Sequence, residues 1–212
     1  MRIAVISDIH GNLEAIEKVL KDIEKENCKR IYCLGDLVLV GKEPKETLDM
    51  LRSLDNIDII QGNTDQMVIG DKIIDPPNEQ IDYFIDYAKS RLTQDDMTYL
   101  KNLHAQKFFE LEGIKFLLVH GSPRRNDENI FPNLKIEEVE EIIKGVDADV
   151  IFCGHTHLPC GYQTNNNKTV VNVGSVGRPF TENPDACYVV ANVNNGEIEF
   201  IHKFVKIENP LR

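Results

Sequence analysis

The sequence lacks any segment that would carry the chain into or across a membrane. No stretch of its 212 residues approaches the roughly 18 apolar residues that a membrane-spanning helix needs. A signal peptide is not predicted either, because the start, MRIAVISDIHGN, has no basic region or small-residue cleavage site. We therefore expect a cytoplasmic protein with no membrane partner.

Positive charge is also scarce. The 24 lysines and arginines stand against 35 aspartates and glutamates, which gives a net charge of −11. Such a surface repels a polyphosphate backbone, so long nucleic acid is not an expected partner, and a nuclease with a basic groove is disfavoured. A small phosphorylated substrate can still bind if cations inside a cleft reverse the local field.

Cysteine pairs with metal-binding spacing are absent. The five cysteines are Cys28, Cys33, Cys153, Cys160 and Cys187, and no two of them form a CxxC motif. We interpret all five as free thiols in a reducing compartment and none as a zinc ligand.

Internal repeats, low-complexity tracts and linkers are missing as well. Hydrophobic residues make up 42% of the chain and charged residues 28%, which is typical of a globular protein. The length suits one α/β domain with a sizeable core. We predict a single domain over residues 1–212.

Strand-like and helical patterns alternate over the first sixty residues. Apolar runs typical of buried strands cover 2–7, 30–34 and 57–60. Between them lie two amphipathic helical patterns, one capped by Asn12 and one opened by Pro44. This alternation predicts right-handed βαβ units and a largely parallel sheet.

The rest of the chain changes character. A polar helical pattern over about 76–104 is broken near Thr93, and a short helix is expected over 136–144. A hairpin is expected to turn at Glu112-Gly113. The strands expected here are 107–112, 114–120, 150–153, 160–164, 169–173, 188–192 and 198–205. The predicted fold class is α/β, with two mixed sheets packed together and helices outside.

Five short motifs stand at or just beyond the ends of apolar runs. They are Asp8-Ile9-His10, Gly35-Asp36, Gly62-Asn63, His120-Gly121 and Gly154-His155-Thr156-His157. Loops beyond the carboxyl ends of strands are where α/β sheets place their sites, and carboxylate, imidazole and amide groups suit Mn²⁺, Fe, Zn²⁺, Ni²⁺ or Co²⁺. In extended segments residues i and i+2 point the same way, so we expect Asp8/His10 and His155/His157 to aim into one cleft.

In order, DIH, GD, GN, VHG and GHTH resemble the motifs of the calcineurin-like metallophosphoesterases, over essentially the whole chain. The length and the trailing VNVGSVGRP segment are similar to the small YfcE-type bacterial and archaeal branch. The resemblance implies a four-layer α/β/β/α sandwich with two metal ions, manganese first among the candidate metals. It implies Asp8, His10 and His157 for the first ion, Asp36 bridging both, and Asn63, His120 and His155 for the second.

The resemblance also implies a mechanism. A hydroxide that bridges the two ions would attack the phosphorus atom, with Asp36, Asn63 and His120 as catalytic groups. The four positive charges of two divalent ions outweigh the two negative charges of Asp8 and Asp36, so the site should attract an anionic phosphate despite the acidic exterior.

The sequence departs from the family pattern at one position. Many members read G-N-H-[DE], where the histidine lies near the leaving oxygen, but here Thr64 follows Asn63. A threonine hydroxyl donates a hydrogen bond but cannot act as an imidazolium acid. We expect this change to favour activated leaving groups, such as phenols or nucleotides.

Three further side chains are candidates for substrate contact. Besides Thr64, Arg178 in GSVGRP is expected to line the pocket, and Arg124 follows the Gly121 motif closely enough to reach a phosphate. A solvated loop arginine is the competing interpretation of Arg124. Asp65 is interpreted as a helix cap.

The sequence thus predicts a metal-dependent hydrolase of small phosphodiesters or nucleotide-like phosphate esters. A phosphomonoesterase of the same fold is the first alternative. A non-catalytic scaffold is the second, since a retromer subunit keeps this fold with an eroded metal site, although no ligand is lost here. The sequence leaves the physiological substrate and the native metal open, and also whether the chain forms a homo-oligomer.

Overall fold

The computed structural model describes residues 1–70, 77–208, 210 and 211. In these residues, six helices and ten strands follow one another along the chain. The helices are α1 (Leu13–Lys25), α2 (Pro44–Arg52), α3 (Asn63–Ile69), α4 (Glu79–Arg91), α5 (Gln94–Lys101) and α6 (Ile136–Ile142). The strands are β1 (Arg2–Ile6), β2 (Arg30–Cys33), β3 (Ile57–Ile59), β4 (Gln106–Leu111), β5 (Ile114–Val119), β6 (Val150–Cys153), β7 (Cys160–Gln163), β8 (Thr169–Asn172), β9 (Ala186–Asn194) and β10 (Glu197–Val205).

The strands form two five-stranded mixed sheets. The first has the order β10-β9-β1-β2-β3, with β1, β2 and β3 parallel and β9 antiparallel to β1 and β10. The second has the order β4-β5-β6-β8-β7, with β5, β6 and β8 parallel. The predicted parallel βαβ units and the predicted hairpin, now β4–β5, are confirmed.

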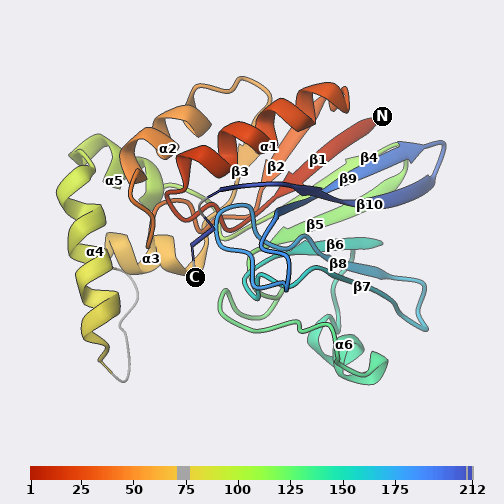
Figure 1. The fold of residues 1–212 in the computed structure, drawn as a ribbon. Helices are drawn as coiled ribbons and strands as arrows, with labels where there is room; N and C mark the ends of the chain where they lie inside the picture. Colours follow the sequence, from red (N-terminus) through yellow and green to blue (C-terminus); the bar gives the residue numbers. More distant parts are fainter. Residues whose placement is uncertain (71–76, 209, 212) are drawn as a thin grey trace.

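The two sheets lie face to face, with α1 and α2 over the outer face of the first and α6 over the outer face of the second (Figure 1). The predicted four layers are confirmed. They follow from the alternation of side chains along each strand, because every central strand is apolar on both faces.

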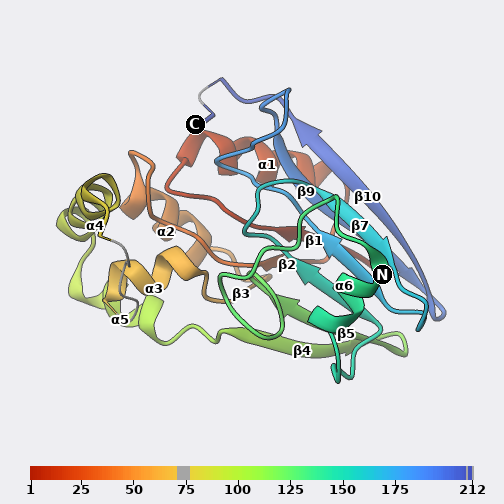
Figure 2. The ribbon, with the colours of Figure 1, turned by 90° about the horizontal axis from the view of Figure 1, so that it is seen from below.

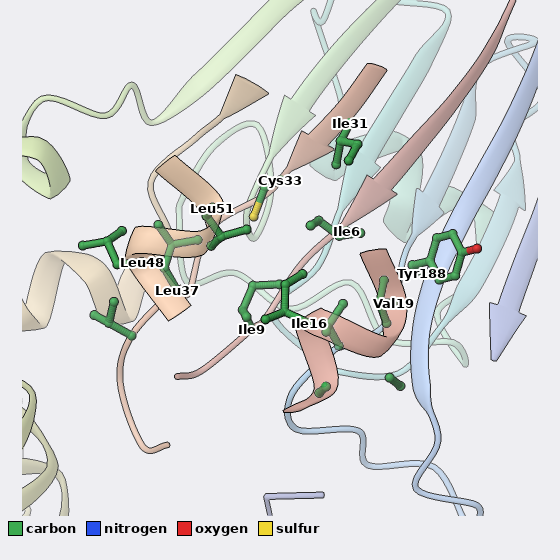
Figure 3. Close-up of a cluster of buried hydrophobic side chains, with 14 of the residues drawn as sticks. Ile6, Ile9, Ile16, Val19, Ile31, Cys33, Leu37, Leu48, Leu51 and Tyr188 are labelled. Carbon is green, nitrogen blue, oxygen red and sulfur yellow. The ribbon is translucent and has the colours of Figure 1, made fainter. Parts of the chain in front are cut away.

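Three buried clusters fill the spaces between these layers. In β1, Ile6 packs with Ile16 and Val19 of α1 in the first cluster (Figure 3), whereas Val5 joins the second cluster between the sheets. Alternate residues of β5 and β6 divide in the same way between the second cluster and the third, which packs under α6. Burial on both faces explains why these strands appear in the sequence as continuous apolar runs.

Helices α3, α4 and α5 gather at one end of the molecule, beyond the first sheet (Figure 2). The predicted break near Thr93 separates α4 from α5, because the Thr93 hydroxyl caps α5 by accepting a hydrogen bond from the Asp96 N–H at 3.2 Å. No helix among the described residues combines the length and the apolar character that a membrane crossing requires.

Candidate active site

Seven side chains from loops after four strands and from α3 meet at one end of the two sheets. The ligand atoms of Asp8, His10 and His157 lie within 4.8 Å of one another, as do those of Asp36, His120 and His155. Asn63, at the start of α3, joins the second group, because its Oδ1 is 2.9 Å from Nε2 of His120. The structure therefore brings together all seven residues that the motifs single out, and we name them the ligand cluster.

The backbone of the ligand cluster is not extended. Asp8, His10, His155 and His157 all have a positive φ, between 53° and 67°. The expectation that each i, i+2 pair lies in an extended segment is therefore wrong. The pairs converge because the loops are tied together: the N–H groups of Asp8 and His10 donate to the carbonyl oxygens of Gly35 and Asp36 at 3.0 and 2.9 Å.

Two glycines permit this close approach of the loops. A Cβ atom on Gly62 would lie 2.1 Å from Oδ1 of Asp36, and one on Gly154 would lie 2.6 Å from Oδ2 of Asp8. Both distances are far shorter than any van der Waals contact. A side chain at either position would displace a carboxylate of the cluster, so the glycines of the GN and GH motifs are required by the space available.

Hydrogen bonds fix the orientation of three histidine rings. The Nδ1 atoms of His10, His120 and His157 lie 3.0, 2.8 and 2.6 Å from the carbonyl oxygens of Leu39, Leu34 and Arg178. A carbonyl oxygen only accepts, so each Nδ1 carries a hydrogen and donates it. In the neutral ring, Nε2 then presents a lone pair to the cluster.

These lone pairs face one another and a carboxylate oxygen. Nε2 of His157 lies 3.1 Å from Nε2 of His10 and also 3.1 Å from Oδ1 of Asp8. Oδ1 of Asp8 is buried and has no hydrogen-bond partner. Acceptors this close repel one another unless a cation or a proton lies among them. The nitrogen and oxygen donor set therefore fits divalent metal ions.

The electrostatics of the cluster determine the charge of its carboxylates. Burial lowers the pKa of His120, but the charges of Asp36 and Asp8 outweigh it and raise that pKa to about 9. Burial raises the pKa of Asp36 and of Asp8, but neighbouring histidines outweigh it and hold both well below their usual range. Both carboxylates are thus ionised and require positive charge beside them.

Asp65 ties together the two loops that carry Asp36 and Asn63. Its Oδ2 accepts hydrogen bonds from the N–H groups of Asp36 and Gly62, and its Oδ1 accepts one from Leu37, all at 2.9 Å. Gly62 is the N-cap of α3, so the interpretation of Asp65 as a capping residue describes one of three hydrogen bonds. The other two could not be predicted from the sequence, because they join residues 28 and 29 positions apart.

The segment after β8 supports the first loop in a similar way. The Ser175 hydroxyl and the Gly177 N–H both donate to the carbonyl oxygen of Asp8 at 2.9 Å. The carbonyl oxygen of Arg178, in the same segment, accepts the hydrogen bond from His157. The VNVGSVGRP segment therefore holds two residues of the ligand cluster, Asp8 and His157, in place.

A cleft of about 410 Å³ opens onto the ligand cluster. Thr64 and Arg178, both expected to contact substrate, line it. The Thr64 hydroxyl oxygen and the Arg178 Nε atom are buried without a hydrogen-bond partner, so both keep an unused hydrogen-bonding group beside the cleft.

Arg124 is not brought into this cleft. Its guanidinium pairs with Glu128 and lies beside a separate hollow near α6. The pairing agrees with the competing interpretation of a loop arginine. His202 also lies elsewhere, with Nε2 2.8 Å from the carbonyl oxygen of Asn172.

The comparison with protein families gives one match over most of the chain. The model of the calcineurin-like phosphoesterase superfamily domain matches residues 1–196. An uncharacterised protein of Methanocaldococcus jannaschii is 31% identical over 215 aligned positions, covering 94% of this chain and 86% of that protein.

Solved structures share the fold. A metallophosphoesterase from Sphaerobacter thermophilus superposes with a TM-score of 0.81 at 26% identity, covering 98% of this chain and 89% of that chain. A hypothetical protein from Pyrococcus horikoshii OT3 gives a TM-score of 0.87 at 23% identity, covering 98% and 88%. The phosphoesterase YfcE of E. coli gives 0.56 at 22% identity, covering 97% and 100%.

Proposed function

This chain belongs to the calcineurin-like phosphoesterase superfamily, and from that premise we propose that it hydrolyses small phosphodiesters or nucleotide-like phosphate esters at a site for two divalent metal ions. Family membership supports phosphoesterase activity in general. The observation that carries the finer proposal is the set of potential ligand atoms, above all Nε2 of His10 and His157 and Oδ1 of Asp8, that face one another in the cluster.

The arrangement of Asp36 supports two ions rather than one. Its Oδ2 lies 3.6 Å from Nε2 of His10, and its Oδ1 lies 3.4 Å from Nε2 of His120. One carboxylate thus faces both ligand groups and is suited to share its oxygens between two ions. The ligands would be Asp8, His10, His157 and Asp36 for the first ion, and Asp36, Asn63, His120 and His155 for the second.

Bound divalent ions, with Mn²⁺ as our first choice and Fe, Ni²⁺, Zn²⁺ or Co²⁺ as alternatives, supply positive charge for the phosphate and acidify the water that attacks phosphorus. The chain's own contribution is to hold and orient. Asn63, which lines the cleft, and the buried His120 lie 2.9 Å apart in the second ligand group, and Asp36 stays ionised between the two groups. Arg178 is placed to contact the non-bridging oxygens of the phosphate.

Thr64 limits which ester bonds are cleaved quickly. Its N–H donates to Oδ1 of Asp36 at 2.9 Å, and its hydroxyl has no hydrogen-bond partner within the protein. The hydroxyl can donate a hydrogen bond to a leaving oxygen but cannot protonate it. We therefore expect activated esters to be cleaved much faster than alkyl esters.

The proposal is tested by rates on metal-stripped protein refilled with Mn²⁺, Ni²⁺ or Zn²⁺. We expect bis(p-nitrophenyl) phosphate to turn over faster than p-nitrophenyl phosphate. Faster turnover of the monoester would favour the phosphomonoesterase alternative. Absence of turnover with every metal would favour a non-catalytic scaffold. The presence of all seven ligand residues argues against that alternative.

Asp36→Asn is the matching variant. Because Asp36 faces both ligand groups, its substitution should weaken the binding of both ions. We expect kcat to fall by at least about 100-fold, since losses of up to about that size follow even from substitution of residues that only support metal ligands. Metal content measured on the purified variant should fall in parallel. Near-normal kcat with two ions bound would contradict a shared carboxylate.

A further inference from the structure

The cleft beside the ligand cluster is lined by apolar as well as polar side chains. The apolar ones are a set of six, which we name the apolar wall: Leu39, Val40, Met67, Ile81, Phe84 and Phe180. Exposed apolar surface of this kind, next to a few converging polar groups, is typical of a site for a ligand with an apolar part.

Helix α4 contributes to the wall with two residues that also pack against the edge of the first core cluster. Ile85 and Ala88 are buried in the first core cluster, at 9% and 1% exposure. Ile81 and Phe84, one turn earlier, are only partly buried and line the cleft. Ile81 and Phe84 therefore present to the cleft the part of their apolar surface that the core leaves uncovered.

Phe180 places apolar surface directly beside the metal-binding side chains. Its ring centroid lies 4.6 Å from that of His157, and the guanidinium carbon of Arg178 lies 5.1 Å from the ring centroid. Half of Phe180 is exposed, so the ring is free to contact a ligand. A group attached directly to a phosphate at the cluster would meet this ring first.

Charge in the cleft is sufficient for one phosphoryl group. Among the described residues that line it, Arg178 carries the one permanent positive charge, and Asn78 and Gln80 contribute neutral amides. A chain of several phosphates would extend past Arg178, and no other described residue that lines the cleft carries a permanent positive charge to offset it.

We propose that the substrate is a phosphate ester of an aromatic alcohol, whose ring packs on Phe180, Phe84 and Ile81 while its single phosphoryl group lies at the ligand cluster and Arg178. This inference rests on the proposed function, since it places phosphorus at the cluster. Thr64 agrees with it independently. A phenol, with a pKa near 10 as in tyrosine, leaves as an anion without a proton donor, so a hydroxyl in place of an imidazole is sufficient.

The test uses binding rather than turnover. Phenylphosphonate and methylphosphonate carry the same phosphoryl group, and neither has an ester bond to cleave. Calorimetric titration of the Mn²⁺-loaded protein should give a Kd for phenylphosphonate at least about tenfold lower, since burying a ring is worth more than one decade in affinity. The ratio should fall to within about threefold in Phe180→Ala and in Phe84→Ala.

Phe108→Ala is the matched control, because Phe108 is a similarly exposed phenylalanine, 55%, on β4 and outside the cleft. It should keep the wild-type ratio. Equal affinity for the two phosphonates, or binding of neither, would overturn the inference, even in a protein that hydrolyses esters. A phenyl preference in a protein without turnover would support the inference and contradict the proposed hydrolysis.

A further titration separates a ring attached to the phosphate from a nucleobase further away. The methylene phosphonate analogue of adenosine 5′-monophosphate should bind no more tightly than phenylphosphonate. If it bound at least tenfold more tightly and lost that advantage in Phe180→Ala, the aromatic ester would be excluded in favour of a nucleotide.

Discussion

Five of the seven ligand-cluster residues hold a backbone conformation that side chains disfavour. Asp8, His10, Asp36, His155 and His157 all have φ between 53° and 67°. Each such residue costs about 1–2 kcal/mol relative to ordinary backbone. The chain maintains this strain where the side chains of the ligand cluster converge, as expected when strained residues are held by the structure around them.

His155 allows this strain to be measured. It is the partly exposed member of the cluster, and its backbone N–H still donates to Asp8 in any variant. In metal-free protein, His155→Gly should be more stable than His155→Ala by about 1 kcal/mol, because only glycine tolerates the positive φ. Urea unfolding of both variants checks this; equal stability would show that the φ costs nothing. Both variants should lose the second ion equally.

Asp65 is a positioning residue for the loops that carry Asp36 and Asn63. Its substitution should weaken metal binding although Asp65 is not itself one of the proposed ligands. Asp65→Asn places an amide against three N–H donors, which should displace the loops of Asp36 and Asn63 and weaken metal affinity by about 10–100-fold. Metal titration in the purified variant measures this.

The control for Asp65 is Asp96→Asn. Asp96 is equally buried, occupies the same N3 position in the capping box of α5, and lies outside the cleft. It should lower stability but leave metal affinity unchanged. Equal metal affinities in the two variants would show that Asp65 is only a capping residue.

At the scale of elements, most of the architecture could be predicted from the sequence. Apolar runs and helical stripes predicted the order of strands and helices, because each element keeps one hydrophobic periodicity along its length. The conformation of the loops could not be predicted in this way. The N–H groups of Asp8 and His10 bond to a loop after a different strand, so their positive φ depends on a partner that periodicity does not show.

Contacts at the cleft were predictable to differing degrees. Arg178 and Thr64 border metal-binding motifs and do line the cleft, whereas Arg124 is drawn away by Glu128, four residues later. The cleft-lining positions of Phe180 and Phe84 could not be predicted, because the sequence pattern does not distinguish an apolar residue that faces a core from one that faces a ligand.

The edge between the two sheets depends on one carboxylate in β3. Asp58 bonds to Arg30 of β2, 2.6 Å away, and to Lys107 of β4 in the other sheet. Burial raises the pKa of Asp58, but hydrogen bonds from Lys107 and Arg30 outweigh it and lower that pKa below the usual value. Its stabilisation is therefore complete above the unfolded-state pKa and is lost as pH falls through the folded-state pKa.

Asp58→Asn should lower the free energy of unfolding by about 1 kcal/mol at pH 7, a modest value because solvent screens the exposed parts of both partners. The difference in free energy of unfolding between variant and wild type should start to shrink as pH falls below about 4, near the unfolded-state pKa of aspartate. It should vanish once pH has fallen through the lower folded-state pKa. Urea unfolding across pH measures it. Asp147→Asn, which removes an exposed pair with Lys115, should show no measurable change at any pH. A gap that widened in acid would refute the assignment.

At the scale of the whole molecule, the ligand cluster joins both sheets. Asp8, His10 and Asp36 follow strands of the first sheet, and His120, His155 and His157 follow strands of the second. Ions bound there would connect the two sheets at the end opposite the N-terminus, beyond the apolar cluster that packs between them.

Metal removal should therefore lower thermal stability. Ions at about 100 times their Kd stabilise the folded state by about 2.7 kcal/mol, and each kcal/mol raises Tm by about 2–4 °C in a protein of this size. We expect a chelator to lower Tm by about 5–10 °C in calorimetry. Asp36→Asn should show a much smaller change, and an equal loss in that variant would point to metal bound elsewhere.

The half-exposed position of Phe180 beside the cleft makes it a suitable site for a fluorescent probe. The chain contains no tryptophan, so Phe180→Trp would be its single indole, half-exposed and against His157. Its emission would be quenched when paramagnetic Mn²⁺ enters and would shift to shorter wavelength when a ring covers it. Metal binding at the ligand cluster and ring binding on the apolar wall could then be followed separately in one sample.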